Sequence, residues 1–309
     1  MFDLSGKTIW VAGHRGMVGG ALVRRLERDG HRVLTAGRDR VDLVRQAEVE
    51  AFVAAERPDV VIVAAARVGG IAANAARPVD FLHDNLMIEA NIMRAAADAG
   101  VAKLMFLGSS CIYPRDAAQP MAENALLTGP LEPTNQWYAV AKIAGIKLAQ
   151  AYRQQLGLDF ISAMPTNLYG PGDNYDLESS HVIPALLRKA IEARDSGAAT
   201  MTVWGSGTPL REFMHVDDLA DALVFLLERY SESDHINVGT GQEVTIAEVA
   251  QIICDTVGFT GTLVFDRSRP DGTPRKLMDS SRLLAMGWAP GIGLREGLAH
   301  AWQAFRAQP

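Results

Sequence analysis

The first half of the chain alternates short, strongly apolar runs with longer segments in which apolar residues recur at helical spacing. One run, 59–65, is apolar almost throughout, as expected of a strand that is buried on both faces. Strands that alternate with helices are typical of a parallel sheet covered by helices on both sides. We predict strands over 8–12, 32–36, 59–65, 103–107 and 160–166, and helices over 17–29, after Pro78 and over 138–155.

The regular alternation is lost after Gly170. Pro171-Gly172-Asp173-Asn174 is a strong turn signal, and short helical patterns and Gly/Pro loops follow it. In this less regular part we predict strands over 202–204 and 235–238 and a helix over 245–257.

The division into domains follows from this change of pattern. The sequence contains no internal repeat, low-complexity tract or flexible linker that would separate two tethered units. We predict an α/β protein with a doubly wound, Rossmann-type parallel sheet over 1–170, joined by about 212–241. A smaller α/β domain takes most of 171–309 and is interwoven with the first.

Composition narrows the classes of function. With 309 residues, 48% of them hydrophobic and 21% charged, the chain resembles ordinary globular proteins. A net charge of −6 argues against a general nucleic-acid or membrane surface. The N-terminus lacks a signal-peptide pattern, and Cys111 and Cys254 form neither a disulfide framework nor a zinc site. We expect a cytoplasmic protein without a membrane span or a bound metal.

Three glycines, Gly13, Gly16 and Gly19, mark the first strand–helix junction. Glycines allow a tight turn and a close backbone approach, and the helix N-terminus offers unpaired N–H groups to a pyrophosphate. Because loops are rich in glycine, a purely structural turn is the alternative. The position at the first junction of a βαβ series favours a dinucleotide-binding turn.

The end of the second predicted strand bears on which dinucleotide is bound. NAD-preferring enzymes place an acid there to bind the ribose 2′-hydroxyl, but this strand runs into Gly37 and Arg38. A guanidinium can hold a 2′-phosphate in bidentate geometry, and Arg15 of the glycine turn can approach the same group. Asp39 leaves an alternative open, as an NAD-type acid or a solvated loop charge. The pattern favours NADP(H).

Tyr138 and Lys142 lie four residues apart in a predicted helix and so share one face. An ammonium beside a phenol favours the phenolate and lowers its pKa from about 10 toward the working range. The spacing alone is weak evidence, since a surface tyrosine beside a lysine would show it too. Ser109 and Ser110 follow a strand at the edge where open α/β sheets bind ligands. Together these groups indicate proton transfer to a carbonyl oxygen.

Short motifs lie along nearly the whole chain, at 13–19, 68–71, 108–114, 138–145, 165–170, 180–186, 204–209 and 270–276. The arrangement resembles the extended short-chain dehydrogenase/reductase superfamily, whose members act on nucleotide sugars. More narrowly, the motifs are similar to those of the GDP-L-fucose synthase family. The Ser-Ser-Cys run at 109–111 and the Ser-His pair at 180–181 distinguish this family from its relatives.

The resemblance implies a two-part reaction. GDP-4-keto-6-deoxy-D-mannose would be epimerised at C3 and C5, and its C4 ketone then reduced with NADPH to give GDP-L-fucose. Tyr138, Lys142 and Ser109 would serve the reduction. The resemblance assigns Cys111 as the base and His181 as the acid of epimerisation, and both side-chain types titrate near neutral pH. Without it, Cys111 would be interpreted as a small buried hydrophobe and His181 as a helix-start or loop residue.

By the same resemblance, the first domain binds NADP(H), the second binds the GDP-sugar, and the protein is a homodimer paired through the helices after Pro78 and from Tyr138. The cofactor residues would be Gly13, His14, Arg15, Gly16, Met17, Val18, Gly19, Arg38, Leu107, Gly108, Ser109, Ser110, Lys142, Pro165, Thr166, Asn167, Leu168 and His181.

The substrate residues implied by the resemblance are Lys189, Trp204, Arg211 and Asp271. Cations suit the diphosphate, an indole suits stacking, and a carboxylate suits sugar or guanine donors. The alternatives are an ordinary core position for Trp204 and a surface salt bridge of Arg211 with Glu212, Asp217 or Asp218.

Two other functions remain to be weighed. A nucleotide-sugar 4,6-dehydratase or 4-epimerase could share the fold, but a dehydratase would carry an Asp-Glu pair in the loop after Ser109. That loop reads Ser110-Cys111-Ile112-Tyr113. A non-catalytic, cofactor-sensing regulator could lose its proton relay without losing the fold. This chain keeps serine, tyrosine and lysine, which favours an enzyme.

Overall fold

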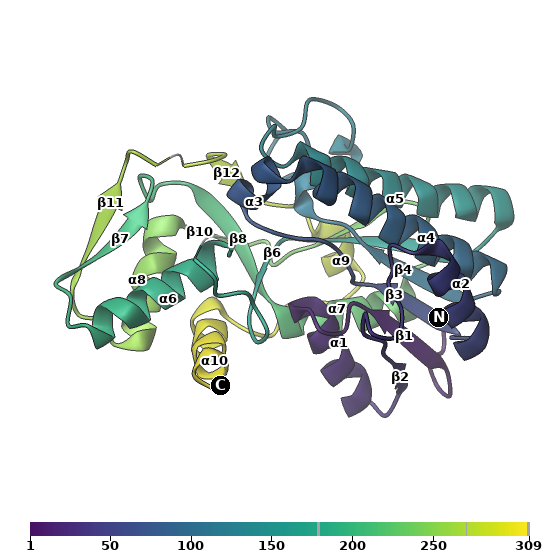
Figure 1. Ribbon diagram of the computed structural model, residues 1–309. Coiled ribbons are helices and arrows are strands. Elements are labelled where there is room, and N and C mark those ends of the chain that lie inside the picture. Colours follow the sequence, from purple (N-terminus) through teal and green to yellow (C-terminus); the bar gives the residue numbers. More distant parts are fainter. Residues whose placement is uncertain (178–179, 270, 308–309) are drawn as a thin grey trace.

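Among the residues that the computed structural model describes (1–177, 180–269 and 271–307), six parallel strands form the central sheet. Their order is β2-β1-β3-β4-β5-β9, and Figure 1 shows this sheet on the right. The order reverses between β1 and β3, which places the ligand crevice of a doubly wound fold at their carboxyl ends. The strands are β1 (Thr8–Ala12), β2 (Arg32–Leu34), β3 (Val60–Val63), β4 (Lys103–Leu107), β5 (Phe160–Pro165) and β9 (Ile236–Val238).

Helices cover both faces of this sheet. Successive side chains of β1 point to opposite faces, so Ile9 and Val11 join one hydrophobic core while Trp10 and Ala12 join the other. The first core is closed by α1 and α7 and the second by α2, α4 and α5. This confirms the predicted doubly wound, Rossmann-type fold. The helices are α1 (Met17–Arg28), α7 (Val216–Arg229), α2 (Gln46–Glu56), α4 (Asn85–Asp98) and α5 (Gln136–Leu156).

Two strands of the large sheet end two residues earlier than the sequence predicts. The second ends at Leu34 instead of residue 36, and the third ends at Val63 instead of residue 65. The third strand stops because its continuation turns under the glycine loop: a Cβ added at Gly13 would lie 2.6 Å from the backbone nitrogen of Ala65. Beyond Val63 one hydrogen bond to β1 is still present, from the nitrogen of Ala64 to the carbonyl of Ala12 at 3.0 Å.

Two helical segments also differ from the prediction. The helix expected after Pro78 begins with a π-helical segment, Asp80–Asp84, which continues into α4. Helix α2 was not predicted, although its buried residues Val49, Phe52 and Val53 have the spacing of one helix face.

The smaller part, on the left of Figure 1, is built around β8. This strand pairs antiparallel with β10 and parallel with β6 and β12, while β7 and β11 pair separately. The chain leaves the large sheet after β5 and returns to it through α7 and β9. The elements are β6 (Asn167–Tyr169), β7 (Thr200–Trp204), β8 (Leu210–His215), β10 (Glu243–Thr245), β11 (Thr262–Asp266), β12 (Arg275–Lys276), α6 (Val182–Asp195), α8 (Ile246–Val257) and α10 (Leu294–Arg306).

Short helices complete the chain: α3 (Ile71–Ala76), α9 (Ser281–Ala285) and 3-10 turns at Ser110–Ile112 and Glu123–Ala125. Within the ranges given above, no helix is long and apolar enough to cross a membrane.

His235 is a buried ionisable group at the β9 edge of the sheet. Its Nε2 lies 3.0 Å from the hydroxyl of Tyr113, and that hydroxyl donates to Oδ1 of Asn237. Since the hydroxyl has one proton, the imidazole must donate from Nε2, which carries a proton both in the matching neutral tautomer and in the imidazolium. Burial lowers the pKa of His235 to about 4, with Asp234 opposing the shift.

Acid should therefore destabilise the fold through His235. Its pKa is lower in the folded than in the unfolded state, so the unfolded chain binds the extra proton between about pH 6.5 and about pH 4. Stability is complete above about pH 6.5 and falls by up to about 3 kcal/mol toward pH 4. His235→Gln should show a smaller loss between about pH 7.5 and about pH 5 in urea unfolding. The exposed His83→Gln is the control and should keep the parental dependence; an equal loss in all three proteins would contradict the assignment.

Candidate active site

The glycine turn between β1 and α1 has no room for side chains at two of its glycines. Gly13 has a φ of +94°, and a Cβ on Gly19 would overlap the carbonyl of Gly13. Gly16 caps α1, and no described side chain accepts a hydrogen bond from the first turn of that helix. The turn thus presents backbone N–H groups at close range, the arrangement that suits a pyrophosphate.

Two arginines lie where the second strand ends. Arg38 is exposed, and the Arg15 guanidinium lies over Gly37, 3.3 Å from Oδ1 of Asp39. Arg15 and Asp39 are 71% and 76% exposed, so their ion pair is weak and can rearrange. Arg15 and Arg38 are therefore both accessible to a 2′-phosphate at this position, while Asp39 stays the acid that a bare ribose hydroxyl could use.

The helix α5 places Tyr138 and Lys142 one turn apart, with Tyr138 half-buried and Lys142 buried. Lys142 is 2% exposed, with Nζ 5.8 Å from the centroid of the Tyr138 ring and 4.6 Å from that of Phe106. The alternative of a surface tyrosine beside a lysine is wrong for this pair.

The pKa of the Tyr138 phenol is raised, first by burial and then by the charges of Cys111 and Glu89. The sequence-based expectation of a lowered pKa is therefore wrong for this geometry. A phenol that holds its proton is nevertheless the form required to donate to an oxygen that gains negative charge.

Cys111 sits in a 3-10 turn directly after β4, beside Ser109. The thiol is 8% exposed, and burial raises its pKa, while Lys276, a hydrogen bond with Ser109 and Lys142 act in the opposite direction. Cys111 is therefore buried, as its interpretation as a small hydrophobe also expected. The two cations are what distinguish this site from an ordinary core cysteine.

His181 caps the N-terminus of α6, as the helix-start alternative expected, but its side chain is exposed and makes no capping hydrogen bond to a described residue. Partial removal of the imidazole from water lowers the pKa of His181, and the charge of Lys276 acts in the same direction. One cation in β12 therefore acts electrostatically on both Cys111 and His181. The sequence analysis did not single out Lys276, although it ends the motif at 270–276.

Trp204 is 54% exposed, so its interpretation as a core residue is wrong. Nζ of Lys189 lies 4.4 Å from the indole and Cζ of Arg269 lies 4.8 Å from it. The exposed ring is thus held between two cations. Arg269 was not predicted, because nothing in the sequence pairs it with Trp204.

Arg211 donates to the carbonyl of Leu210 and not to the predicted acidic partners. Asp217 pairs with Arg24 at 2.7 Å, and Glu212 and Asp218 accept backbone N–H groups. Asp271 accepts a hydrogen bond from the nitrogen of Ser206 at 2.6 Å, which lowers the pKa of its carboxyl, and its charge also acts on Arg211. Asp271 thereby fixes the turn that follows Trp204.

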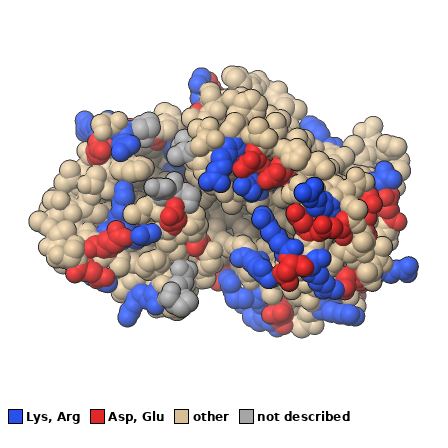
Figure 2. Space-filling view, in the orientation of Figure 1, with Lys and Arg blue, Asp and Glu red and all other residues tan. Residues whose placement is uncertain are grey.

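The other predicted cofactor residues follow the carboxyl ends of two neighbouring strands. Leu107, Gly108, Ser109 and Ser110 come at the end of β4, and Pro165, Thr166, Asn167 and Leu168 at the end of β5. His14, Met17 and Val18 belong to the glycine turn and the start of α1. Figure 2 shows a hollow between the two parts of the molecule, with Lys and Arg side chains around it.

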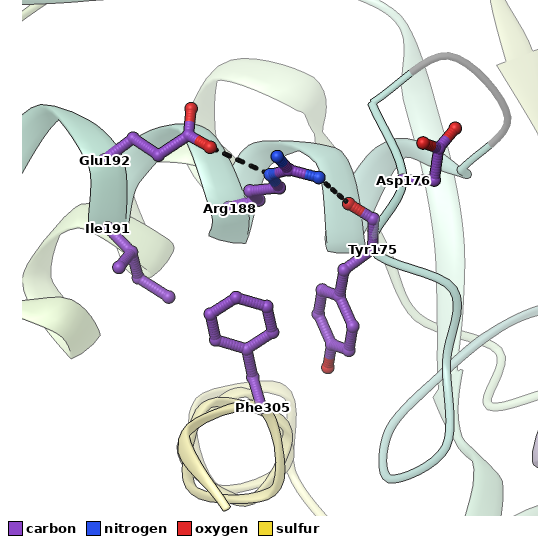
Figure 3. A pocket seen from close by; sticks show the side chains of 6 residues that line it. All are labelled: Tyr175, Asp176, Arg188, Ile191, Glu192 and Phe305. Atoms are coloured by element: carbon purple, nitrogen blue, oxygen red, sulfur yellow. Dashed lines mark hydrogen bonds and ion pairs between the residues drawn. The ribbon is translucent and has the colours of Figure 1, made fainter. Parts of the chain in front are cut away.

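A separate cavity of about 530 Å³ lies in the smaller part. Figure 3 shows the rings of Tyr175 and Phe305 side by side in it, with Arg188 bridging Glu192 and the carbonyl of Tyr175. None of the predicted site residues lines this cavity. Within the described residues, no cluster of His, Cys, Asp and Glu is placed to hold a metal ion.

The profile of the NAD dependent epimerase/dehydratase family matches residues 9–239. The GDP-L-fucose synthase of Sinorhizobium fredii is 59% identical over 99% of this chain and 97% of its own length, and GDP-L-fucose synthase 1 of Arabidopsis thaliana is 58% identical over 99% and 94%. The solved GDP-L-fucose synthetase of Naegleria fowleri bound to NADP superposes with a TM-score of 0.91 at 29% identity, covering 99% and 96%. The chain therefore belongs to the NAD dependent epimerase/dehydratase family and, within it, to the GDP-L-fucose synthases.

Proposed function

We propose that this protein converts GDP-4-keto-6-deoxy-D-mannose to GDP-L-fucose, with NADPH as reductant. One observation carries the proposal: the proposed base of epimerisation lies close to the proposed groups of reduction. Cys111 interacts electrostatically with Tyr138, Lys142 and Lys276. One substrate can therefore be epimerised and reduced without leaving the site. The relatives named above, which are GDP-L-fucose synthases, support the same reaction. NADPH oxidation with the keto-sugar, followed by identification of the product, tests it directly.

Epimerisation needs a base on one face of the sugar and an acid on the other. The ketone at C4 acidifies the protons at C3 and C5, and Cys111 removes them as a thiolate. The ammonium groups of Lys276 and Lys142 favour that thiolate against the cost of burial. His181, exposed at the start of α6, supplies a different proton to the opposite face, while the removed proton stays on Cys111.

Reduction uses the neighbouring groups of α5 and the β4 loop. Bound NADPH supplies a hydride to C4. Tyr138 gives its proton to the oxygen at C4, and Ser109 orients that oxygen by a hydrogen bond. Lys142, a buried cation one helical turn from Tyr138, opposes the negative charge that then remains on the phenol.

The GDP portion of the substrate binds on the smaller part. Trp204 offers its exposed indole to the guanine or sugar, and Lys189, Arg269 and Arg211 offer cations to the diphosphate. Accordingly, residues 1–170 with about 212–241 form the cofactor domain, and most of 171–309 forms the substrate domain.

The protein acts as a cytoplasmic homodimer. Trp137 and Val140 form an exposed apolar pair on α5, the helix through which we expect the two copies to meet. A reducing compartment suits a mechanism that needs the free thiol of Cys111. Light scattering that shows a monomer at micromolar concentration would contradict the dimer.

Arg38→Asp should shift preference from NADPH toward NADH. The change removes a charge-assisted contact to the 2′-phosphate, worth about 1.5–3 kcal/mol, and introduces an acid that repels it. The ratio of kcat/KM for the two cofactors should therefore change by about 10-fold to 100-fold or more. An unchanged ratio would leave selectivity to Arg15.

Tyr138→Phe should block reduction while proton exchange at C3 and C5 persists. Loss of the proton donor should lower the rate of NADPH oxidation by about 100-fold or more. Exchange is followed by NMR of the sugar in deuterated water with the same variant. Equal loss of both activities would show that Tyr138 serves both half-reactions.

Cys111→Ser should divide the half-reactions in the opposite sense. A serine hydroxyl is far too weak a base to remove an α-proton, whereas the two nearby lysines make a thiolate accessible. Hydride should still reach C4, and the product should be enriched in the unepimerised GDP-6-deoxy-hexose.

In the parent, proton exchange at C3 and C5 should accelerate as pH rises above neutral, because burial holds the thiol of Cys111 protonated. If Cys111→Ser produces GDP-L-fucose at nearly the rate of the parent, Cys111 is a packing residue.

A further inference from the structure

Glu89 is a charged residue buried beneath the catalytic helix. It belongs to α4 and is 2% exposed. Neither of its carboxylate oxygens has a hydrogen-bond partner of good geometry among the described residues. A buried carboxylate without satisfied bonds is costly, and the fold keeps one only where a charge compensates it. None of the roles assigned above uses this residue.

The compensating charge comes from α5. Oε2 of Glu89 packs against Gly145, where an added Cβ would lie 2.8 Å from it and 2.7 Å from the edge of the Phe106 ring. Nζ of Lys142, one turn before Gly145, lies 4.6 Å from the centroid of the same ring. The carboxylate and the ammonium thus border one phenyl ring in a region nearly closed to water. Gly145 allows this approach because it has no side chain.

We propose that Glu89 is a positioning residue: its carboxylate keeps the buried Lys142 charged and directed along α5 toward Tyr138 during reduction. The role assigned to reduction rests on the proposed function, whereas the pairing of Glu89 with Lys142 does not depend on the identity of the substrate.

The charges around Lys142 oppose one another. Burial lowers the pKa of the Lys142 ammonium, while Glu89 of α4 and Cys111 of the β4 loop raise it. On its own helix Lys142 faces Tyr138, whose pKa Glu89 raises. Of the two acidic groups near Lys142, Glu89 ionises at lower pH than the thiol of Cys111. Glu89 is therefore the group that can supply a full negative charge at a pH where the thiol is still protonated. Without it, burial would lower the pKa of Lys142 further.

The pair also predicts a pH dependence. Burial raises the pKa of Glu89 to about 7, with Lys142 and the N–H of Gly145 opposing the shift. As pH falls through this value the carboxyl gains a proton and Lys142 loses its counter-charge. The reduction rate should therefore fall on the acid side of neutral, as well as at high pH where Lys142 loses its own proton.

The first test measures ionisation without any substrate. The chain has six lysines, so ¹³Cε-labelled lysine gives few NMR signals, and Lys142 is assigned with Lys142→Arg. Glu89→Gln should lower the pKa of Lys142 by about one to three units, the effect of losing an opposite charge at short range. Glu89→Asp keeps the charge at a greater distance and should give a smaller fall. An unchanged Lys142 pKa in Glu89→Gln would overturn the inference.

The second test is the pH profile of NADPH oxidation. Glu89→Gln should lose the limb near pH 7 and move the high-pH limb to lower pH, with a loss of about 10-fold or more at pH 8. Asn91→Ala is the matched control: it removes a buried hydrogen bond from α4 to the carbonyl of Leu43 and should lower the melting temperature without moving the profile. A profile of Glu89→Gln that superimposes on the parent would also overturn the inference.

The two tests separate the inference from the proposed function. If Glu89→Gln lowers the Lys142 pKa but the parent does not reduce the keto-sugar, the ion pair is supported and the proposed function is contradicted. If Glu89→Gln does not fold, the parent decides between the outcomes: the ¹³Cε signal of Lys142 should shift as Glu89 titrates at about pH 7, and a signal that does not respond there would overturn the inference.

Discussion

The carboxylate of Glu212 holds together the backbone segments through which the chain passes between its two parts. Its Oε1 accepts from the nitrogen of Gly241 at 2.8 Å and its Oε2 from that of Met278 at 3.2 Å. The side chain of Asn167 donates to the Glu212 carbonyl at 2.8 Å. Glu212 is fully buried, and burial raises its pKa against these donors. A buried carboxylate is tolerable only with such donors, so the segments around Gly241 and Met278 must lie against β8 as they do.

The strand that carries Glu212 also aligns the chemistry of the two parts. Arg211 precedes Glu212 in β8, and the register of β12 places Lys276 opposite Arg211. Lys276 in turn acts on Cys111, which belongs to the first part, and on His181, which belongs to the second. One short ladder of backbone hydrogen bonds therefore fixes Arg211, a proposed substrate cation, relative to Lys276, which acts on both proposed epimerisation groups. Under the proposed function, a change in this ladder would alter substrate binding and proton transfer together.

Sequence predicted the features whose geometry is local. The glycine turn and the Tyr138–Lys142 spacing depend on a few consecutive residues, and a helix brings the latter onto one face whatever surrounds it. Features that depend on distant neighbours were missed: Arg269 meets Trp204, and Lys276 meets Cys111, only after folding. The expected pKa of Tyr138 was wrong for the same reason, because the sequence does not reveal that burial, Cys111 and Glu89 together raise it.

Burial sets the order in which the site's charges can form. A thiolate at Cys111 raises the pKa of Tyr138, so the two negative charges oppose each other in a region poor in water. In the proposed mechanism Tyr138 gives up its proton in the reduction, and it does so more easily when Cys111 is a neutral thiol, the form that burial favours. A thiolate that forms for epimerisation must therefore be protonated again before the phenolate can form at low cost. The shared environment thus keeps the two anions from forming together, with Lys142 favouring the anion at whichever of the two groups holds the charge.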